Sequence, residues 1–230
     1  MDKRICGFEV LPFPEKPEYL PISDKEFRRD TLAAWCRGGY REKIAAALYG
    51  GEREWAALYK DRDVSVRAAV ACRADEATQL KMLNDPAPLV RKLLARYGTD
   101  KVRTAAVKGW ETDTEVLMEI AKWGSAATKR RVLELAWHLP ETLKQVIPYL
   151  SPGCIKKLEI YPDRGIRYEA AMHGGMAQCQ RFLDAIRKDR DTGSFLMRWN
   201  IQSRVEELGN VKKALLGGLF RSRKHVEMER

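Results

Sequence analysis

Residues 63–91 read DVSVRAAVACRADEATQLKMLNDPAPLVR, and this stretch decides the fold. It opens with Asp-x-x-Val-Arg, which ends at Arg67, and a second Val-Arg pair ends at Arg91. The step between these arginines is 24 residues, which is enough for two short helices and their turns. Because a unit of that size cannot bury its own apolar face, it must stack on neighbouring copies.

A third copy lies 100 residues after the first, where Asp-Arg-Gly-Ile-Arg ends at Arg167. The Asp of the first and third copies can cap the amides of a helix, and the apolar residue before each Arg points into the stack. We therefore interpret Arg67, Arg91 and Arg167 as a ladder of cations that pair with Asp residues of neighbouring turns. Contact with a ligand is the alternative for these arginines.

Start signals predict where individual helices begin, both before this stretch and within it. Ser23-Asp-Lys-Glu26 is a capping box, and Pro86 or Pro88 is suited to the first turn of a helix. No segment shows sustained alternation of apolar and polar residues, so we predict no strand. We expect four to five imperfect helix pairs between about Glu52 and Leu183.

The composition divides the chain into three parts. Residues 1–22 hold four prolines and are expected to form an extended arm. Residues 23–220 are predicted to form one helical repeat domain, with Gly209-Asn210 interrupting its last segment, and residues 221–230 a basic tail. The arm should lie against the first helices through Phe8, Val10, Leu11, Phe13 and Tyr19.

Composition indicates the class of protein and the cellular compartment in which it functions. No apolar run approaches the roughly 18 residues that a membrane-spanning helix needs, so we expect no membrane partner. The N-terminus lacks the apolar core of an export signal. Five scattered cysteines without a Cys-x-x-Cys pair favour reduced, buried thiols and a cytoplasmic location.

The positive charge is concentrated late in the chain. The net charge is +10, and residues 151–230 hold 16 Lys and Arg against 10 Asp and Glu. A basic third of this kind suggests an acidic partner, which is nucleic acid, an acidic protein or an anionic surface. A moderate excess of charge that serves solubility alone, on solvated helix faces, is the alternative. The candidate residues for such binding are Lys129, Arg130, Arg131, Lys156, Lys157, Arg187, Lys188, Arg190, Arg221, Arg223 and Lys224.

The repeat also resembles a known family. Asp-x-x-Val-Arg-x-x-Val-Ala at 63–71, followed by Leu-x-x-Leu-x-Asp at 80–85, is similar to the leucine-rich-repeat variant family, a relative of HEAT-like α-solenoids. The resemblance covers roughly residues 55–185 and implies an all-α, right-handed solenoid of stacked short helix pairs. Some members hold an iron–sulfur centre on an N-terminal cysteine cluster. This chain has only Cys6 before Cys36, so we expect no cofactor.

Catalytic motifs are missing from the sequence, which favours a non-enzymatic protein. His138, His173 and His225 lack the spacing of a metal site, so we expect no metal. There is no Walker loop, dinucleotide-binding glycine motif or nucleophile elbow.

One arrangement allows an enzymatic interpretation. HEAT-like alkylpurine DNA glycosylases hold a damaged nucleotide with aromatic residues and a carboxylate on a concave face. Arg103, Trp110 and Asp113 are our concave-face candidates, although the local sequence does not match those enzymes closely enough to transfer residues. Of the six tryptophans, three or four are expected to fill core positions at helix junctions.

The leading hypothesis is a helical-repeat interaction module that binds a protein partner on its concave face, as a regulator or inhibitor. A stack of helix pairs presents an extended surface for such contacts. The alternative is a basic nucleic-acid-binding repeat protein, with glycosylase activity as the lowest-ranked form.

Overall fold

The computed structural model describes residues 3–109, 111–187 and 192–228, with side chains described at 4–109, 111–187 and 193–212. Within these ranges the chain forms fourteen α-helices, two short 3-10 helices and one two-stranded hairpin. The fold is therefore mostly helical, as the sequence predicts. Contacts divide the chain into two compact units, Met1–Leu135 and Ala136–Arg230.

The helices occur as pairs with a regular spacing. The first helix of each pair begins 24, 24, 26, 26 and 24 residues after the first helix of the preceding pair, and the second helices begin at the same intervals. The first helices are α2 (Tyr40–Tyr49), α4 (Val64–Arg73), α6 (Pro88–Tyr97), α8 (Thr114–Trp123), α10 (Pro140–Val146) and α12 (Arg164–His173). The second helices are α3 (Glu52–Leu58), α5 (Glu76–Lys81), α7 (Asp100–Ala106), α9 (Ala126–Ala136), α11 (Pro152–Lys157) and α13 (Met176–Ile186).

The described residues thus contain six pairs, more than the four to five expected. The prediction began the array at about Glu52, whereas the first pair begins at Tyr40. The remaining elements are β1 (Lys3–Ile5), β2 (Phe8–Val10), α1 (Asp24–Trp35), the 3-10 helices η1 (Ile147–Tyr149) and η2 (Leu158–Ile160), and α14 (Thr192–Met228).

Local signals set the helix starts as the sequence predicts. The Ser23 hydroxyl accepts from the Glu26 amide at 3.2 Å, and the Glu26 carboxylate accepts from the Ser23 amide at 3.0 Å, which completes the capping box of α1. Asp63 caps α4 by accepting from the Ser65 amide at 2.7 Å. Pro88 is the first residue of α6, where its missing N–H leaves no helical bond unmade.

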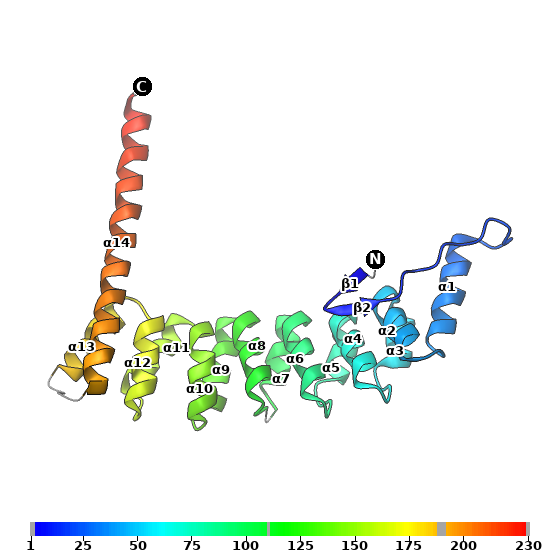
Figure 1. The fold of residues 1–230 in the computed structure, drawn as a ribbon, viewed down its shortest axis with the longest axis horizontal. Helices are drawn as coiled ribbons and strands as arrows, with labels where there is room; N and C mark the ends of the chain where they lie inside the picture. The colour runs from blue at the N-terminus through cyan, green and yellow to red at the C-terminus, as the bar shows by residue number, and fades with distance from the viewer. Residues whose placement is uncertain (1–2, 110, 188–191, 229–230) are drawn as a thin grey trace. The chain divides into compact units, whose positions relative to one another are not determined.

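In the first unit, the first helices pack on one another (Figure 1). Helix α4 packs between α2 and α6, and α6 packs on α8. Val66 and Val90, which precede Arg67 and Arg91, are fully buried in this core, as predicted, and so are Val70 and Leu94 one helical turn later. In the second unit, α12 packs on α10, α11 and α13, and α13 packs on α14 around Cys179, Phe182 and Ile201.

The prediction that the chain has no strand is wrong. β1 and β2 form an antiparallel hairpin inside the Pro-rich segment 1–22. Cys6 and Gly7 link them with φ of 53° and 87°, as a two-residue turn with two left-handed residues requires. The strands have three residues each, too few to show an alternating pattern.

The N-terminal segment packs largely as predicted. Val10 is buried, and Phe8, Leu11 and Phe13 lie against the same core. The ring of Phe13 contacts Trp35 of α1 and Tyr49 of α2 edge-on, with centroids 5.3 Å and 5.7 Å apart. Tyr19 differs, because 85% of its surface is exposed.

The predicted break at Gly209-Asn210 is also wrong. Helix α14 runs without interruption through both residues. A single interior glycine lowers helix stability by about 1 kcal/mol relative to alanine, which packing can offset. A Cβ at Gly209 would lie 3.9 Å from the end of the Met176 side chain, so α14 passes close to the start of α13 there.

Candidate functional site

Cations on the first helices of three pairs meet a carboxylate that follows the second helix. Lys43 Nζ lies 2.8 Å from Asp61 Oδ2. Arg67 donates from Nε to Asp85 Oδ2 at 2.6 Å and from Nη2 to Oδ1 at 3.0 Å. Hydrogen bonds with Asp85 raise the pKa of Arg67 above its ordinary value. The predicted ladder is confirmed at Arg67.

The ladder differs from the prediction at Arg91. Its partner is Glu111 rather than an Asp, with Nε to Oε2 at 2.7 Å and Nη2 to Oε1 at 3.3 Å. The third and fourth first helices start 26 residues apart, so the connection after α7 is longer and the carboxylate comes 20 residues after Arg91.

Two backbone carbonyls accept hydrogen bonds from each of the three predicted ladder residues, Arg67, Arg91 and Arg167. Nη1 of Arg67 donates to the carbonyls of Asp61 and Arg62 at 2.9 and 3.2 Å. Nη1 of Arg91 donates in the same way five and six residues back, at 3.3 and 2.8 Å. Arg167 repeats the contact with the carbonyls of Tyr161 and Pro162, at 2.6 and 2.8 Å. The guanidinium is therefore fixed similarly at all three positions.

Arg167 lacks the carboxylate, which corrects the predicted ladder. The residue 18 positions after Arg67 is Asp85, whereas the residue 18 positions after Arg167 is Ala185. Within the described part of the chain, Arg167 makes no ion pair. Asp184, which precedes Ala185 in the sequence, accepts a hydrogen bond from Gln180 at 3.2 Å instead.

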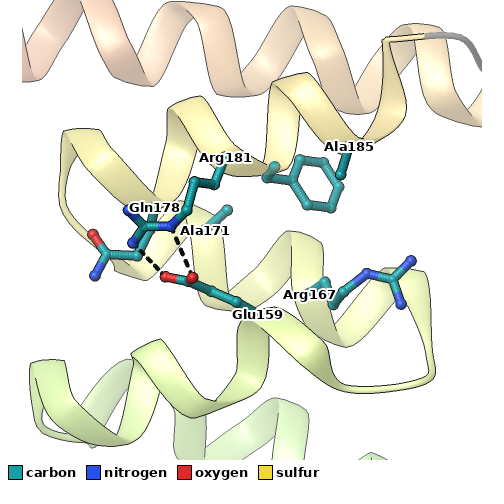
Figure 2. A pocket seen from close by; sticks show the side chains of 7 residues that line it. Glu159, Arg167, Ala171, Gln178, Arg181 and Ala185 are labelled. Atoms are coloured by element: carbon teal, nitrogen blue, oxygen red, sulfur yellow. Dashed lines mark hydrogen bonds and ion pairs between the residues drawn. The ribbon is translucent and has the colours of Figure 1, made fainter.

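A cavity of about 50 Å³ lies at this position, lined by Arg167, Ala185 and five residues around them. An ion pair between Arg181 and Glu159 also lies at the cavity, and Figure 2 shows that the Arg167 guanidinium is turned away from it. That pair is bidentate, at 2.8 and 2.6 Å, and its hydrogen bonds raise the pKa of Arg181. The remaining lining residues are Ala171, Gln178 and Phe182.

Arg103, the first concave-face candidate, belongs to a second repeated contact. Its Nε donates to the carbonyl of Ala95 at 2.7 Å, near the end of α6. Trp55, Gln79 and Cys179 make the equivalent bond to the carbonyl eight residues earlier, at 2.9, 2.9 and 3.2 Å. Each donor is the fourth residue of its second helix and satisfies a carbonyl near the C-terminus of the first.

The other two concave-face candidates are Asp113 and Trp110. Asp113 is the N-cap of α8, where one carboxylate oxygen accepts from the amides of Glu115 and Val116 at 3.0 and 3.1 Å. Its carboxylate thus has a capping role. Trp110 lies outside the described residues.

The basic candidates whose side chains are described belong to α9, α11 and the end of α13. On α9, Lys129 is half-buried at the position equivalent to Arg103, Arg130 is exposed, and Arg131 pairs with Glu134 at 2.8 Å. Lys156 and Lys157 are exposed in the last turn of α11, where positive charge suits the helix dipole. Arg187 is exposed at the C-cap of α13.

The side chains of the remaining basic candidates are outside the described part of the structure. Lys188 and Arg190 lie outside the described residues. Arg221, Arg223 and Lys224 belong to the range of α14, but their side chains are outside those described.

A patch on α14, which the sequence did not single out, exposes three large apolar side chains. Phe195, Leu196 and Trp199 are 58%, 57% and 64% exposed. They share one face of the helix because they fall within an arc of about 100°. Met197 and Ile201 lie on the covered side, against α13 and its core, and Ser194 on that side is fully buried.

Across the described residues, no three or more His, Cys, Asp and Glu side chains are grouped so that they could hold a metal ion. None of the described helices combines the length and the apolar character that crossing a membrane requires. No protein-family model, curated protein or solved structure matches this chain.

Proposed function

We propose that the protein is a right-handed, HEAT-like α-solenoid related to leucine-rich-repeat variant proteins, and that it binds a protein partner without catalysis. The regular spacing of the six helix pairs in the described residues supports the repeat. The recurrence of the arginine–carbonyl and second-helix–carbonyl contacts supports it further. Repeat arrays of this kind typically function as binding surfaces.

The exposed patch on α14 is the single observation that carries the binding function. Phe195, Leu196 and Trp199 are large and apolar, yet more than half of each is in contact with water. Leaving this much apolar surface exposed forgoes burial free energy of about 25 cal/mol per Å². Aromatic side chains supply much of the binding energy at protein interfaces. For this reason we choose α14, rather than the concave face expected from sequence, as the contact.

Affinity capture from cells that make the protein tests this proposal. We expect the wild-type chain to retain specific proteins that the double variant Phe195→Ser/Trp199→Ser does not retain. Tyr40→Ser is the matched control, because Tyr40 is an exposed aromatic residue of α2 in the first unit. Equal capture by the wild-type protein and the double variant would contradict binding through α14.

Nucleic-acid binding is the second candidate function. Arg130, Lys156 and Lys157 are exposed and make no ion pair within the described part of the chain, which favours it. Binding of phosphates releases counterions, so the affinity for an oligonucleotide should fall steeply as salt rises. An anisotropy titration that shows a steep salt dependence, and a loss of affinity in a variant with these three residues changed to Ser, would support this function. A flat salt response would exclude it.

A further inference from the structure

The cavity at Arg167 lies where this chain elsewhere places a carboxylate. Resting on the proposed function, we propose that it binds the carboxylate of an Asp or Glu side chain in an acidic segment of the protein partner. That carboxylate would take the place beside Arg167 that Asp85 takes beside Arg67. The partner thereby completes the ion-pair ladder.

The donors of Arg167 are held in place before any ligand arrives. Carbonyls of Tyr161 and Pro162 fix its Nη1, as the carbonyls of Asp61 and Arg62 fix that of Arg67. The Nε and Nη2 donors form the edge that grips Asp85 in the earlier pair. Because a guanidinium held in this way has lost most of its freedom already, a carboxylate can bind with little further ordering.

Helix α13 is longer than α3 and α5, and it carries an alanine where the carboxylate would be. Helices α3 and α5 end at Leu58 and Lys81, and the chain then turns to present Asp61 and Asp85. Helix α13 continues to Ile186, so position 185 lies on the helix and carries only a methyl group. The cavity of about 50 Å³ beside this small side chain has room for a group of a few atoms.

Charge and shape favour a carboxylate over a phosphate. Arg181 and Glu159 neutralise each other, so Arg167 supplies the one unpaired charge that lines the cavity among the described residues. A carboxylate carries one negative charge, whereas a phosphate monoester carries nearly two at neutral pH. The planar edge of a guanidinium also matches the two oxygens of a carboxylate. Ala171, Phe182 and Ala185 provide apolar contacts for the methylene groups of a Glu side chain.

An NMR titration of the 15N-labelled full-length chain tests the site directly. The probe is N-acetylglutamate N-methylamide, and the signal is the Nε–H resonance of Arg167, assigned from the spectrum of Arg167→Lys. The glutamine analogue is the neutral control, and N-acetylphosphoserine N-methylamide tests the phosphate alternative. Two variants at an exposed position, Ala185→Asp and Ala185→Asn, differ by one charge and should both keep the fold.

We expect the resonance to shift saturably with the glutamate probe and to stay unchanged with the glutamine probe. The affinity should fall about tenfold or more in Ala185→Asp, because its carboxylate competes for the same two donors, and should persist in Ala185→Asn. Equal binding of both probes, equal affinity in the two variants, or tighter binding of the phosphoserine probe would overturn the proposal. None of these results depends on a partner. Failed titration with successful capture therefore removes only this inference. Successful titration with failed capture removes the proposed function and leaves a carboxylate site without a protein partner.

Discussion

Arg67 and Asp85 form a two-point ion pair that joins one helix pair to the next. Arg67 lies on α4, and Asp85 lies in the turn between α5 and α6. Only 11% of the Arg67 side chain and 5% of the Asp85 side chain are exposed. Asp85 Oδ1 also accepts from the Ala87 amide at 2.9 Å, which orders the start of α6. The Arg67–Asp85 ion pair therefore connects two successive helix pairs, and it also orders the turn between them.

Asp85→Asn should destabilise the protein by about 3–5 kcal/mol, because it leaves the Arg67 guanidinium buried without its counter-charge. Urea denaturation followed by circular dichroism measures this loss. Glu141→Gln is the control, because Glu141 pairs with Lys144 on an exposed surface. Its cost should stay within about 1 kcal/mol. Equal losses in the two variants would contradict a structural role for the Arg67–Asp85 pair.

Gln79→Leu should lower the free energy of unfolding by about 1–3 kcal/mol, because the buried carbonyl of Ala71 loses its donor. Gln180→Leu offers a matched change on the exposed surface of α13, where we expect an effect within about 0.5 kcal/mol. The same denaturation measurement separates them. If both variants are as stable as the wild-type protein, the repeated side-chain cap contributes nothing to folding.

Carboxylates that connect one second helix to the next should make the free energy of unfolding depend on pH in the acid range. A hydrogen bond from Lys101, and then one from Thr99, lowers the pKa of Glu76. The Ser125 amide lowers the pKa of Asp100. Because the folded pKa lies below the unfolded value, the stabilisation is complete above the ordinary values of about 3.9 to 4.3. It is lost as the pH falls through the lower folded pKa.

Urea denaturation at a series of acid pH values measures this dependence. We expect the free energy of unfolding to decline below about pH 4, and to decline less steeply in Asp100→Asn. Glu18→Gln, which changes an exposed carboxyl group in the segment 1–22, should keep the wild-type slope. A wild-type slope in Asp100→Asn would show that the Ser125 contact does not favour the ionised form.

The thiol of Cys72 should be unreactive in the folded protein. Burial, followed by the neighbouring Cys6, raises the pKa of this thiol well above its ordinary range. Only the thiolate is nucleophilic, so alkylation at about pH 8 should be slow until the chain unfolds. Mass spectrometry of the peptide containing Cys72, with and without urea, gives the two rates. Similar rates in both conditions would contradict the buried position of Cys72 in α4.

The helix starts and the inward-facing residues could be predicted because their causes are local. The side chains of Ser23 and Asp63 cap amides a few residues away, and Val66 and Val70 are four positions apart on one helix. Such short-range relations are visible in a sequence. The hairpin is also local, and the glycine at its turn, Gly7, was an available signal.

The cavity and the exposed patch depend on longer-range packing. The sequence shows that Arg167 repeats Arg67, and the same shift of 100 residues compares Asp85 with Ala185. That comparison could have found the missing carboxylate. No such signal existed for Phe195 and Trp199, since their spacing of four residues equally fits a buried stripe. Which face of α14 is covered depends on its packing against α13.

Photo-crosslinking in the native cell tests the central claim, that the protein binds a protein partner through α14. A photoreactive benzoylphenylalanine in place of Trp199 reports contacts at the exposed patch, and the same group in place of Tyr40 is the control. We predict discrete protein adducts at position 199 that are absent at position 40. Adducts with nucleic acid at position 199, the same adducts at both positions, or no adducts at all would contradict it.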